Sequence, residues 1–308
     1  MATETISLDR VTKRHATTTA VRELSLSVDQ GEMFGLIGPD GAGKTTTIRL
    51  ICGLLRPDSG SVRVFGLDPV RDHRRLTRFV GYFSQRFSLY GDLSVDENIA
   101  FFAEIHGVGD YAARRDRLLE LMQLTPFRAR LADRLSGGMK QKLALACTLV
   151  HEPALIVLDE PTTGVDPVSR REFWKLLSEF LAQGITIVMA TPYLDEAERC
   201  SRVAMLHEGR LLALDRPAAL RSTLGGSLYE VIVREHRRAA AALSEVPGVS
   251  DVQMFGERAH VRVEQRDERA VEQLTARLTE AGLTVTSVRP IATSLEDVFI
   301  ARLREATS

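Results

Sequence analysis

A glycine-rich segment at residues 38–46 has the composition and spacing of a phosphate-binding loop. It fits the pattern G-x-x-x-x-G-K-[ST], follows a short apolar run, and opens a stretch with helical periodicity. Glycines let backbone N–H groups turn inward around phosphates, and the start of a helix adds its positive dipole. We expect the following residues to bind a nucleotide: Gly38, Pro39, Asp40, Gly41, Ala42, Gly43, Lys44, Thr45 and Thr46.

Two acidic residues, Asp159 and Glu160, directly follow the apolar run 155–158. Carboxylates after a strand more often mark a solvated strand end or a helix cap, but open α/β sheets also place their ligand crevice there. Paired with the phosphate loop, they predict an ATPase site. Lys44 would reach the β- and γ-phosphates, Thr45 and Asp159 would hold Mg²⁺, and Glu160 would polarise the attacking water.

A third motif, LSGGMKQ at 135–141, precedes the acidic strand and opens an amphipathic helix. Ser136 is alternatively just the N-cap of that helix. In sequence order, GPDGAGKTT, LSGGMKQ and LIVLDEP resemble the ATPase domains of ABC transporters, over about residues 4–225. The resemblance implies a head-to-tail dimer, in which the LSGG signature of one chain covers the ATP held by the other. It implies trans contacts from Ser136, Gly137, Gly138 and the D-loop residue Asp166.

Two further positions are interpreted through the same resemblance. Gln85 matches the family's Q-loop glutamine, which joins Mg²⁺ to the surface that grips a membrane partner, although a lone Gln after a strand is usually just solvated. The aromatic residues Phe87 and Tyr90 support a docking surface there. His15 aligns with the family's adenine-stacking aromatic residue, and an imidazole can stack on a base with less contact area.

The segment ATPYLDEA, at 190–197, departs from the family pattern. Most relatives carry a switch histidine where this chain has Pro192. Proline has neither a side-chain donor nor a backbone N–H, so it cannot make the histidine's contact with the γ-phosphate. Three accounts stay open: Thr191 or Tyr193 supplies a hydroxyl, hydrolysis is slow, or the chain pairs with an intact relative. We favour slow but real hydrolysis, since Glu160 and Lys44 are both present.

Composition narrows the other possibilities. The 308 residues carry 40 Lys and Arg against 41 Asp and Glu, a net charge of −1, so we expect no nucleic-acid partner and no nonspecific binding to anionic lipid. Three widely spaced cysteines argue against zinc and a disulfide framework, which fits a reducing cytosol. The first ten residues lack the features of a secretion signal, and no run approaches the roughly 18 apolar residues of a membrane span. Any membrane role requires a separate permease.

The surrounding pattern predicts an α/β fold that positions these motifs. Antiparallel strands at 6–11 and 24–28 precede strands at 33–37, 62–65, 79–83, 155–158 and 185–190, with a hairpin around 207–210. Helical periodicity covers 44–54, 137–151 and 169–183, and an inserted helical subdomain is expected between Asp92 and Met122. Alternating strands and helices imply a mainly parallel sheet covered on both faces, a phosphate-loop NTPase of ABC type.

The predicted order of strands and helices changes near Gly225. From there the order strand, helix, strand, strand, helix, strand predicts a small α+β, ferredoxin-like module, followed by a terminal helix. Its second helix is expected at 268–282 and its third strand at 259–265. We therefore predict an ATPase domain at 1–225 and a C-terminal module at 226–308, with a regulatory or permease-coupling role favoured over simple capping of the dimer.

A closer likeness is to the ATPase subunits of ABC-2-type exporters, such as those for daunorubicin resistance and sodium export. Segments 84–99, 195–213 and 294–303 carry it. It implies a cytoplasmic subunit, peripheral on the inner face of the membrane, that works with an ABC-2-type permease as a homodimer or heterodimer. The alternatives are a soluble ABC protein acting on a non-membrane partner and a module in which ATP is a switch without turnover.

Overall fold

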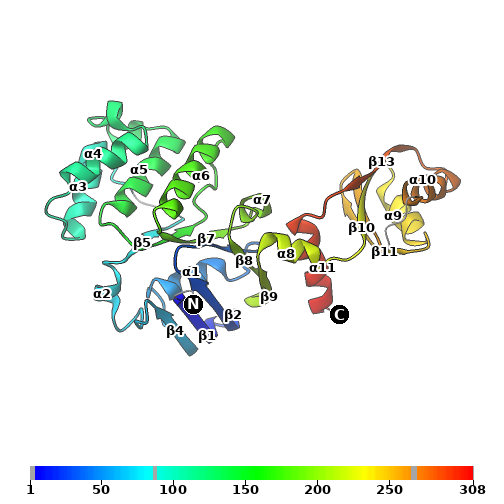
Figure 1. The fold of residues 1–308 in the computed structure, drawn as a ribbon, viewed down its shortest axis with the longest axis horizontal. Helices are drawn as coiled ribbons and strands as arrows, with labels where there is room; N and C mark the ends of the chain where they lie inside the picture. Colours follow the sequence, from blue (N-terminus) through cyan, green and yellow to red (C-terminus); the bar gives the residue numbers. More distant parts are fainter. Residues whose placement is uncertain (1–3, 86–88, 265–268, 308) are drawn as a thin grey trace. The chain divides into compact units, whose positions relative to one another are not determined.

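The computed structural model describes residues 4–85, 89–264 and 269–307. The chain forms two compact units. One comprises the residues up to Pro217 together with the segment from Arg302, and the other comprises Ala218–Ala301 (Figure 1). The domain boundary expected from the sequence, after residue 225, stays a prediction.

Six strands form the central sheet of the larger unit, in the order β5-β6-β7-β3-β8-β9. All neighbouring pairs are parallel except the β8–β9 hairpin. Every residue of β3, β6 and β7 is buried, as expected for parallel strands covered on both faces. The strands are β3 (Met33–Ile37), β5 (Val80–Phe83), β6 (Leu155–Asp159), β7 (Thr186–Thr191), β8 (Arg202–His207) and β9 (Arg210–Asp215).

A second, antiparallel sheet has the order β2-β1-β4 and contains β1 (Glu4–His15), β2 (Thr18–Asp29) and β4 (Ser59–Val64). Its inward side chains share one core with the first helix, α1 (Lys44–Ile51), and with the central sheet. Ile6, Ile48 and Leu36 are fully buried there. The predicted antiparallel start and the parallel sheet are therefore confirmed, and α1 lies between them.

Helix α1 ends earlier than the periodicity predicts, because Gly53 has a φ of 69°. This left-handed conformation is open to glycine at little cost, and a right-handed helix cannot continue through it. The phosphate loop is thus followed by a helix of only eight residues. That helix packs against β4, β6 and β7.

The inserted helical subdomain contains α3 (Val95–Ile105) and α4 (Ala112–Leu121), and α3 packs on α5 (Gly137–Leu149), as Figure 1 shows. A capping box starts α3: Ser94 Oγ accepts from the Glu97 N–H, and Glu97 accepts from the Ser94 N–H. The larger unit also contains α2 (His73–Leu76), α6 (Pro167–Ala182) and α7 (Leu194–Ala197), with 3₁₀ turns at Thr125–Phe127 and Ala132–Arg134. Helix α8 (Pro217–Ser222) begins at the last residue of this segment and continues into the smaller unit.

The smaller unit has the predicted βαββαβ order. Its sheet is antiparallel, in the order β11-β12-β10-β13, which is ferredoxin-like. Parts of the predicted strand 259–265 and helix 268–282 fall on residues 265–268, outside the described residues. The elements are β10 (Ser227–Val233), α9 (His236–Ser244), β11 (Val249–Phe255), β12 (Arg258–Val263), α10 (Ala270–Glu280) and β13 (Val285–Ile291). Helix α11 (Leu295–Thr307) starts in the smaller unit, and its residues from Arg302 belong to the larger one.

Cys52, Cys147 and Cys200 are all free thiols in buried positions. Across residues 4–85, 89–264 and 269–307, no helix combines the length and the apolar character that crossing a membrane requires.

A pair of stacked histidines is expected to make the stability of the larger unit depend on pH. The rings of His106 and His151 stack at 3.8 Å, and a ring nitrogen of His151 lies 3.3 Å from the Val80 carbonyl oxygen. Burial, followed by the neighbouring His106, lowers the pKa of His151 to about 4, and burial lowers that of His106. Between pH 6.5, near the ordinary histidine pKa, and pH 4, His151 is therefore protonated in the unfolded chain but neutral in the folded chain.

We expect the free energy of unfolding to fall as the pH drops through this window. His151→Asn removes the titrating ring, so the wild type should lose about 2 kcal/mol more than the variant between pH 7 and pH 5. Urea unfolding of both proteins at the two pH values measures the difference. Equal losses would show that His151 titrates normally in the folded chain.

Candidate functional site

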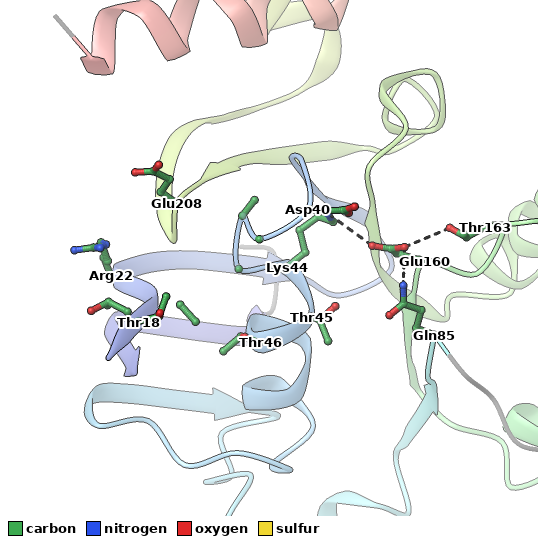
Figure 2. A pocket seen from close by; sticks show the side chains of 15 residues that line it. Thr18, Arg22, Asp40, Lys44, Thr45, Thr46, Gln85, Glu160, Thr163 and Glu208 are labelled. Atoms are coloured by element: carbon green, nitrogen blue, oxygen red, sulfur yellow. Dashed lines mark hydrogen bonds and ion pairs between the residues drawn. The ribbon is translucent and has the colours of Figure 1, made fainter. Parts of the chain in front are cut away.

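A pocket of about 830 Å³ opens over the start of α1 (Figure 2). The phosphate loop forms its floor, and segments from β2, the end of β5, the end of β6 and the β8–β9 turn supply its walls. Its lining includes predicted residues from three motifs that are far apart in the sequence. These are Asp40, Gly41, Ala42, Gly43, Lys44, Thr45, Thr46, Gln85 and Glu160.

The phosphate loop is held in a shape that only small residues permit. Gly43, the N-cap of α1, has a φ of 100°, and a Cβ added there would lie 2.4 Å from the Ala20 carbonyl oxygen. The loop follows β3 directly, with Gly38 and Pro39 at its start. The N–H groups of the first turn of α1 therefore face the pocket, in an arrangement that binds anions.

Lys44 is only 4% exposed and donates to two carbonyl oxygens of its own loop. Its Nζ lies 2.8 Å from the Gly38 oxygen and 3.0 Å from the Pro39 oxygen. The nearest carboxylate oxygen, Oε1 of Glu160, is 3.7 Å away. The ammonium group thus sits over the loop with neutral acceptors that an anion can replace.

Glu160 is held from three sides, as Figure 2 shows. Besides the ion pair with Lys44, its Oε2 accepts from Gln85 Nε2 at 3.0 Å and from Thr163 Oγ1 at 3.3 Å. Its φ of 50° is unusual for a residue with a side chain, and its N–H donates to the Ala190 oxygen at 2.9 Å. The structure therefore brings Glu160, Lys44 and Gln85 together.

Asp159, the last residue of β6, is 1% exposed. Its Oδ1 accepts from the Thr45 hydroxyl at 3.0 Å, and its Oδ2 is buried without a partner among the described residues. Burial, with a smaller contribution from Glu160, raises the pKa of Asp159. A buried carboxylate oxygen without a donor, beside a hydroxyl, has the oxygen chemistry that suits a hard divalent cation.

The signature residues lie outside this pocket. Ser136 is the N-cap of α5 and accepts from the Met139 N–H at 3.3 Å, so the capping alternative describes its contact within one chain. Ser136 and Gly137 are exposed, whereas Gly138 packs closely against Ser169, near the start of α6. Asp166 caps α6, and its hydrogen bonds with Ser169 lower its pKa.

Pro192 follows the last residue of β7 and is half-buried. The hydroxyl of Thr191 is buried and donates to Glu196 Oε2 at 2.7 Å. Of the two residues considered as substitutes for a switch histidine, Thr191 is therefore already engaged away from the phosphate loop. The ring of Tyr193 lies under the Arg170 guanidinium, 4.9 Å from it.

Three further residues were expected to stack on adenine or to form a docking surface. His15 is exposed at the end of β1 and does not line the pocket. Tyr90 is 44% exposed and packs edge-on against Phe101. Phe87, expected at the same docking surface, lies outside the described residues.

Several lining residues were not predicted. Thr163 could have been predicted from the sequence, because it lies only three positions after Glu160, in the loop that follows the acidic pair. Arg22 and Glu208 carry no signal in the sequence: a backbone hydrogen bond of 2.8 Å, from the Arg22 N–H to the Gly209 oxygen, brings their segments together. The unpredicted lining residues are Thr18, Thr19, Ala20, Arg22, Thr163 and Glu208.

Comparison with known proteins assigns both parts of the chain. Residues 21–163 match the ABC transporter family, and residues 216–302 match the C-terminal domain of ATP-binding proteins like DrrA1-3. The chain is 42% identical over 286 residues to the probable multidrug ABC transporter ATP-binding protein YbhF of Escherichia coli (strain K12). That match covers 91% of this chain but 48% of YbhF, so the chain spans about half the length of this relative.

Two relatives match over nearly their full length. The daunorubicin resistance ATP-binding protein DrrA3 of Streptomyces coeruleorubidus is 33% identical, with 97% of this chain and 96% of that protein covered. The Nod factor export ATP-binding protein I of Paraburkholderia xenovorans (strain LB400) is 36% identical, covering 91% and 96%.

Solved structures give the same result. The ATP-binding subunit of an ABC transporter aligns with a TM-score of 0.65 at 30% identity, covering 71% of this chain and 92% of its own. A dimeric ATP-binding cassette in a post-hydrolysis state, bound to ADP and Pi, aligns with a TM-score of 0.61 at 25% identity, covering 68% and 98%. The pocket, the fold and these relatives together show that the chain belongs to the ATP-binding proteins of the ABC transporter family.

Proposed function

We propose that this chain binds and hydrolyses ATP as the motor subunit of an ABC exporter. The observation that carries the proposal is the convergence of Lys44, Gln85 and Glu160 in one pocket above the first turn of α1. A phosphate-binding floor, a cation and a buried carboxylate are the parts that phosphoryl transfer to water requires. In this proposal Lys44 exchanges its loop carbonyls for the β- and γ-phosphates.

Glu160 acts as the general base in this site. Its partners Gln85 and Thr163 fix the carboxylate on one side of the phosphate loop, where it can accept a proton from an attacking water. The ion pair with Lys44 is replaced when phosphates engage that lysine, which frees Oε1 for the water. Holding the base before the substrate arrives avoids a cost of reorganisation during the reaction.

A Mg²⁺ ion fits the neighbouring oxygens. Thr45 and Asp159 would hold it, with Gln85 beside them. Burial raises the pKa of Asp159, and its Oδ2 has no partner among the described residues, so a cation there would stabilise the charged carboxylate. Such an ion would supply positive charge next to the phosphates and would offset the negative charge that develops on them during transfer.

Covering the bound ATP with a signature motif requires a second copy of the ATPase domain. Ser136 and Gly137 are exposed at the start of α5, and Asp166 is exposed at the start of α6. These residues do not line the pocket of their own chain, which leaves them available to the ATP of another. The dimeric cassette among the structural relatives supports pairing of two chains. In this proposal the pair is head-to-tail, either a homodimer or a heterodimer.

The partner we propose is an ABC-2-type permease, with the ATPase peripheral on the cytoplasmic face of the membrane. The names of the relatives, which specify multidrug transport, daunorubicin resistance and Nod factor export, support an exporter. Residues 226–308 would form a regulatory or permease-coupling module, in keeping with their DrrA-like match. ATP acting only as a binding switch on a non-membrane partner is the alternative, favoured by Pro192.

Hydrolysis of MgATP by the purified chain tests the proposal. We expect ATP-dependent phosphate release that Lys44→Ala abolishes, because this substitution removes the ammonium group that contacts the loop carbonyls. Lys175→Ala, which truncates an exposed lysine on α6, should leave the rate unchanged. Phosphate release that persists in Lys44→Ala would reject this pocket as the site of hydrolysis.

A further inference from the structure

A buried carboxylate lies behind the site, on the short helix α7. Glu196 is 1% exposed, and its carboxylate is contacted by side chains from three separate segments. The Thr191 hydroxyl, at the end of β7, donates to Oε2 at 2.7 Å, and the Thr162 hydroxyl donates to Oε1. The Nε of Arg170, in the first turn of α6, lies 3.8 Å from Oε1.

Because Glu196 is buried, its carboxylate must keep its hydrogen-bonding and charged partners in place. A carboxylate that is removed from water is costly unless its oxygens are hydrogen-bonded and its charge is paired. Here two hydroxyls and one guanidinium supply those partners, and each lies on a different element. Movement of any one segment would leave a buried charge short of a partner, so Glu196 favours a single arrangement of all three.

The segments that Glu196 joins are those that flank the catalytic carboxylate and the switch position. Thr162 is two residues after Glu160, in the same turn, where the Thr163 N–H donates to the Glu160 oxygen. Thr191 directly precedes Pro192, and its Oγ1 also accepts from the Tyr193 N–H at 3.0 Å. Residues on both sides of Pro192 are therefore attached to this cluster.

Two features show that the Glu160 turn needs such support. Glu160 has a φ of 50°, a conformation that side-chain-bearing residues adopt only when their surroundings impose it. Apart from its side-chain contacts, its N–H reaches across to β7, donating to the Ala190 oxygen at 2.9 Å. The Glu196 cluster adds a second link between the same turn and the end of β7.

We propose that Glu196 is a positioning residue for ATP hydrolysis, holding the Glu160 turn against the segment around Pro192. Pro192 offers no donor to a phosphate, so the segment contributes by fixing the geometry of the catalytic base. This inference rests on the proposed function, with Glu160 as the base. It assigns a role to a buried group that does not line the pocket.

Single-turnover hydrolysis and ATP affinity, measured side by side, test the assignment. Glu196→Gln keeps the shape of the side chain but removes its charge, and should slow hydrolysis by about 10- to 100-fold, because small displacements of a catalytic group have effects of that size. The Kd for ATP should change less than about twofold, since Lys44 and the loop are untouched. Asp195→Asn, at the exposed neighbouring position on α7, should behave like the wild type.

Two further variants separate positioning from folding. Thr162→Val removes one hydroxyl from the cluster and should slow hydrolysis in the same direction. Thr148→Val removes a buried hydroxyl bonded to the Ala144 oxygen within α5 and should not. In a Glu160→Gln background, Glu196→Gln should cause no further loss, because the positioned base is already gone.

The outcomes are distinct. Wild-type chain that fails to turn over ATP would overturn the proposed function and this inference together. Active wild type with an unchanged rate in Glu196→Gln, or a rate loss fully matched by weaker ATP binding, would overturn only the inference. If Glu196→Gln does not fold, the comparison of Thr162→Val with Thr148→Val decides, and equal rates in those two variants would reject the role of the cluster.

Discussion

Replacement of Glu160 by Gln should reduce ATP hydrolysis by about 10²–10⁴-fold while leaving ATP binding intact. The amide keeps the size of the side chain and can still meet Gln85 and Thr163, but it cannot accept a proton from water. It also removes the negative partner of Lys44, so the ammonium is more available to phosphates. Single-turnover hydrolysis and equilibrium binding of ATP measure the two effects separately.

Glu120→Gln is the matched control, because Glu120 is an exposed acid on α4, far from the pocket in sequence and in fold. It should hydrolyse ATP at the wild-type rate. A Glu160→Gln protein that retains more than about a tenth of the wild-type rate would show that another group activates the water.

Replacement of Pro192 by His should speed hydrolysis, by up to about 10²–10³-fold, since that is the usual value of one preorganised donor at a developing charge. The substitution adds a side-chain donor and a backbone N–H at a half-buried position directly after β7. Thr191 cannot replace that donor without giving up its bond to Glu196. Single-turnover rates of the wild type and the variant test the expectation.

Asp195→His places the same imidazole three residues further along, on the exposed side of α7, and should give no gain. If Pro192→His also gives no gain, and the wild type already turns over at typical enzyme rates of about 1–10³ s⁻¹, then this position does not limit the chemistry.

The elements were predictable from the sequence because their physical signals are local. Apolar runs such as 33–37 and 155–158 become fully buried parallel strands, and β3 begins and ends where the run does. The βαββαβ order expected for the C-terminal module is the order of elements in the observed smaller unit. The end of α1 was missed, because a single glycine in a left-handed conformation overrides the periodicity around it.

The site was predictable in its motifs but not in its contacts. The phosphate loop and the Asp159–Glu160 pair follow from residue types at fixed spacing, whereas the bond from Gln85 to Glu160 joins residues 75 positions apart. Pairing between β2 and the β8–β9 turn, which places Arg22 and Glu208 at the pocket, is a tertiary event without a local signature. The same holds for Glu196, whose partners are drawn from three segments.

We expect ATP to join two copies of the chain, and the mass of the Glu160→Gln protein in solution measures whether it does. With Mg²⁺ and ATP present, the particle should have twice the chain's mass, and it should return to the mass of one chain when ATP is omitted or when Lys44→Ala is added. A Glu160→Gln protein that binds ATP yet keeps the mass of one chain, at ATP concentrations well above its Kd, would show that ATP does not join two copies of this chain.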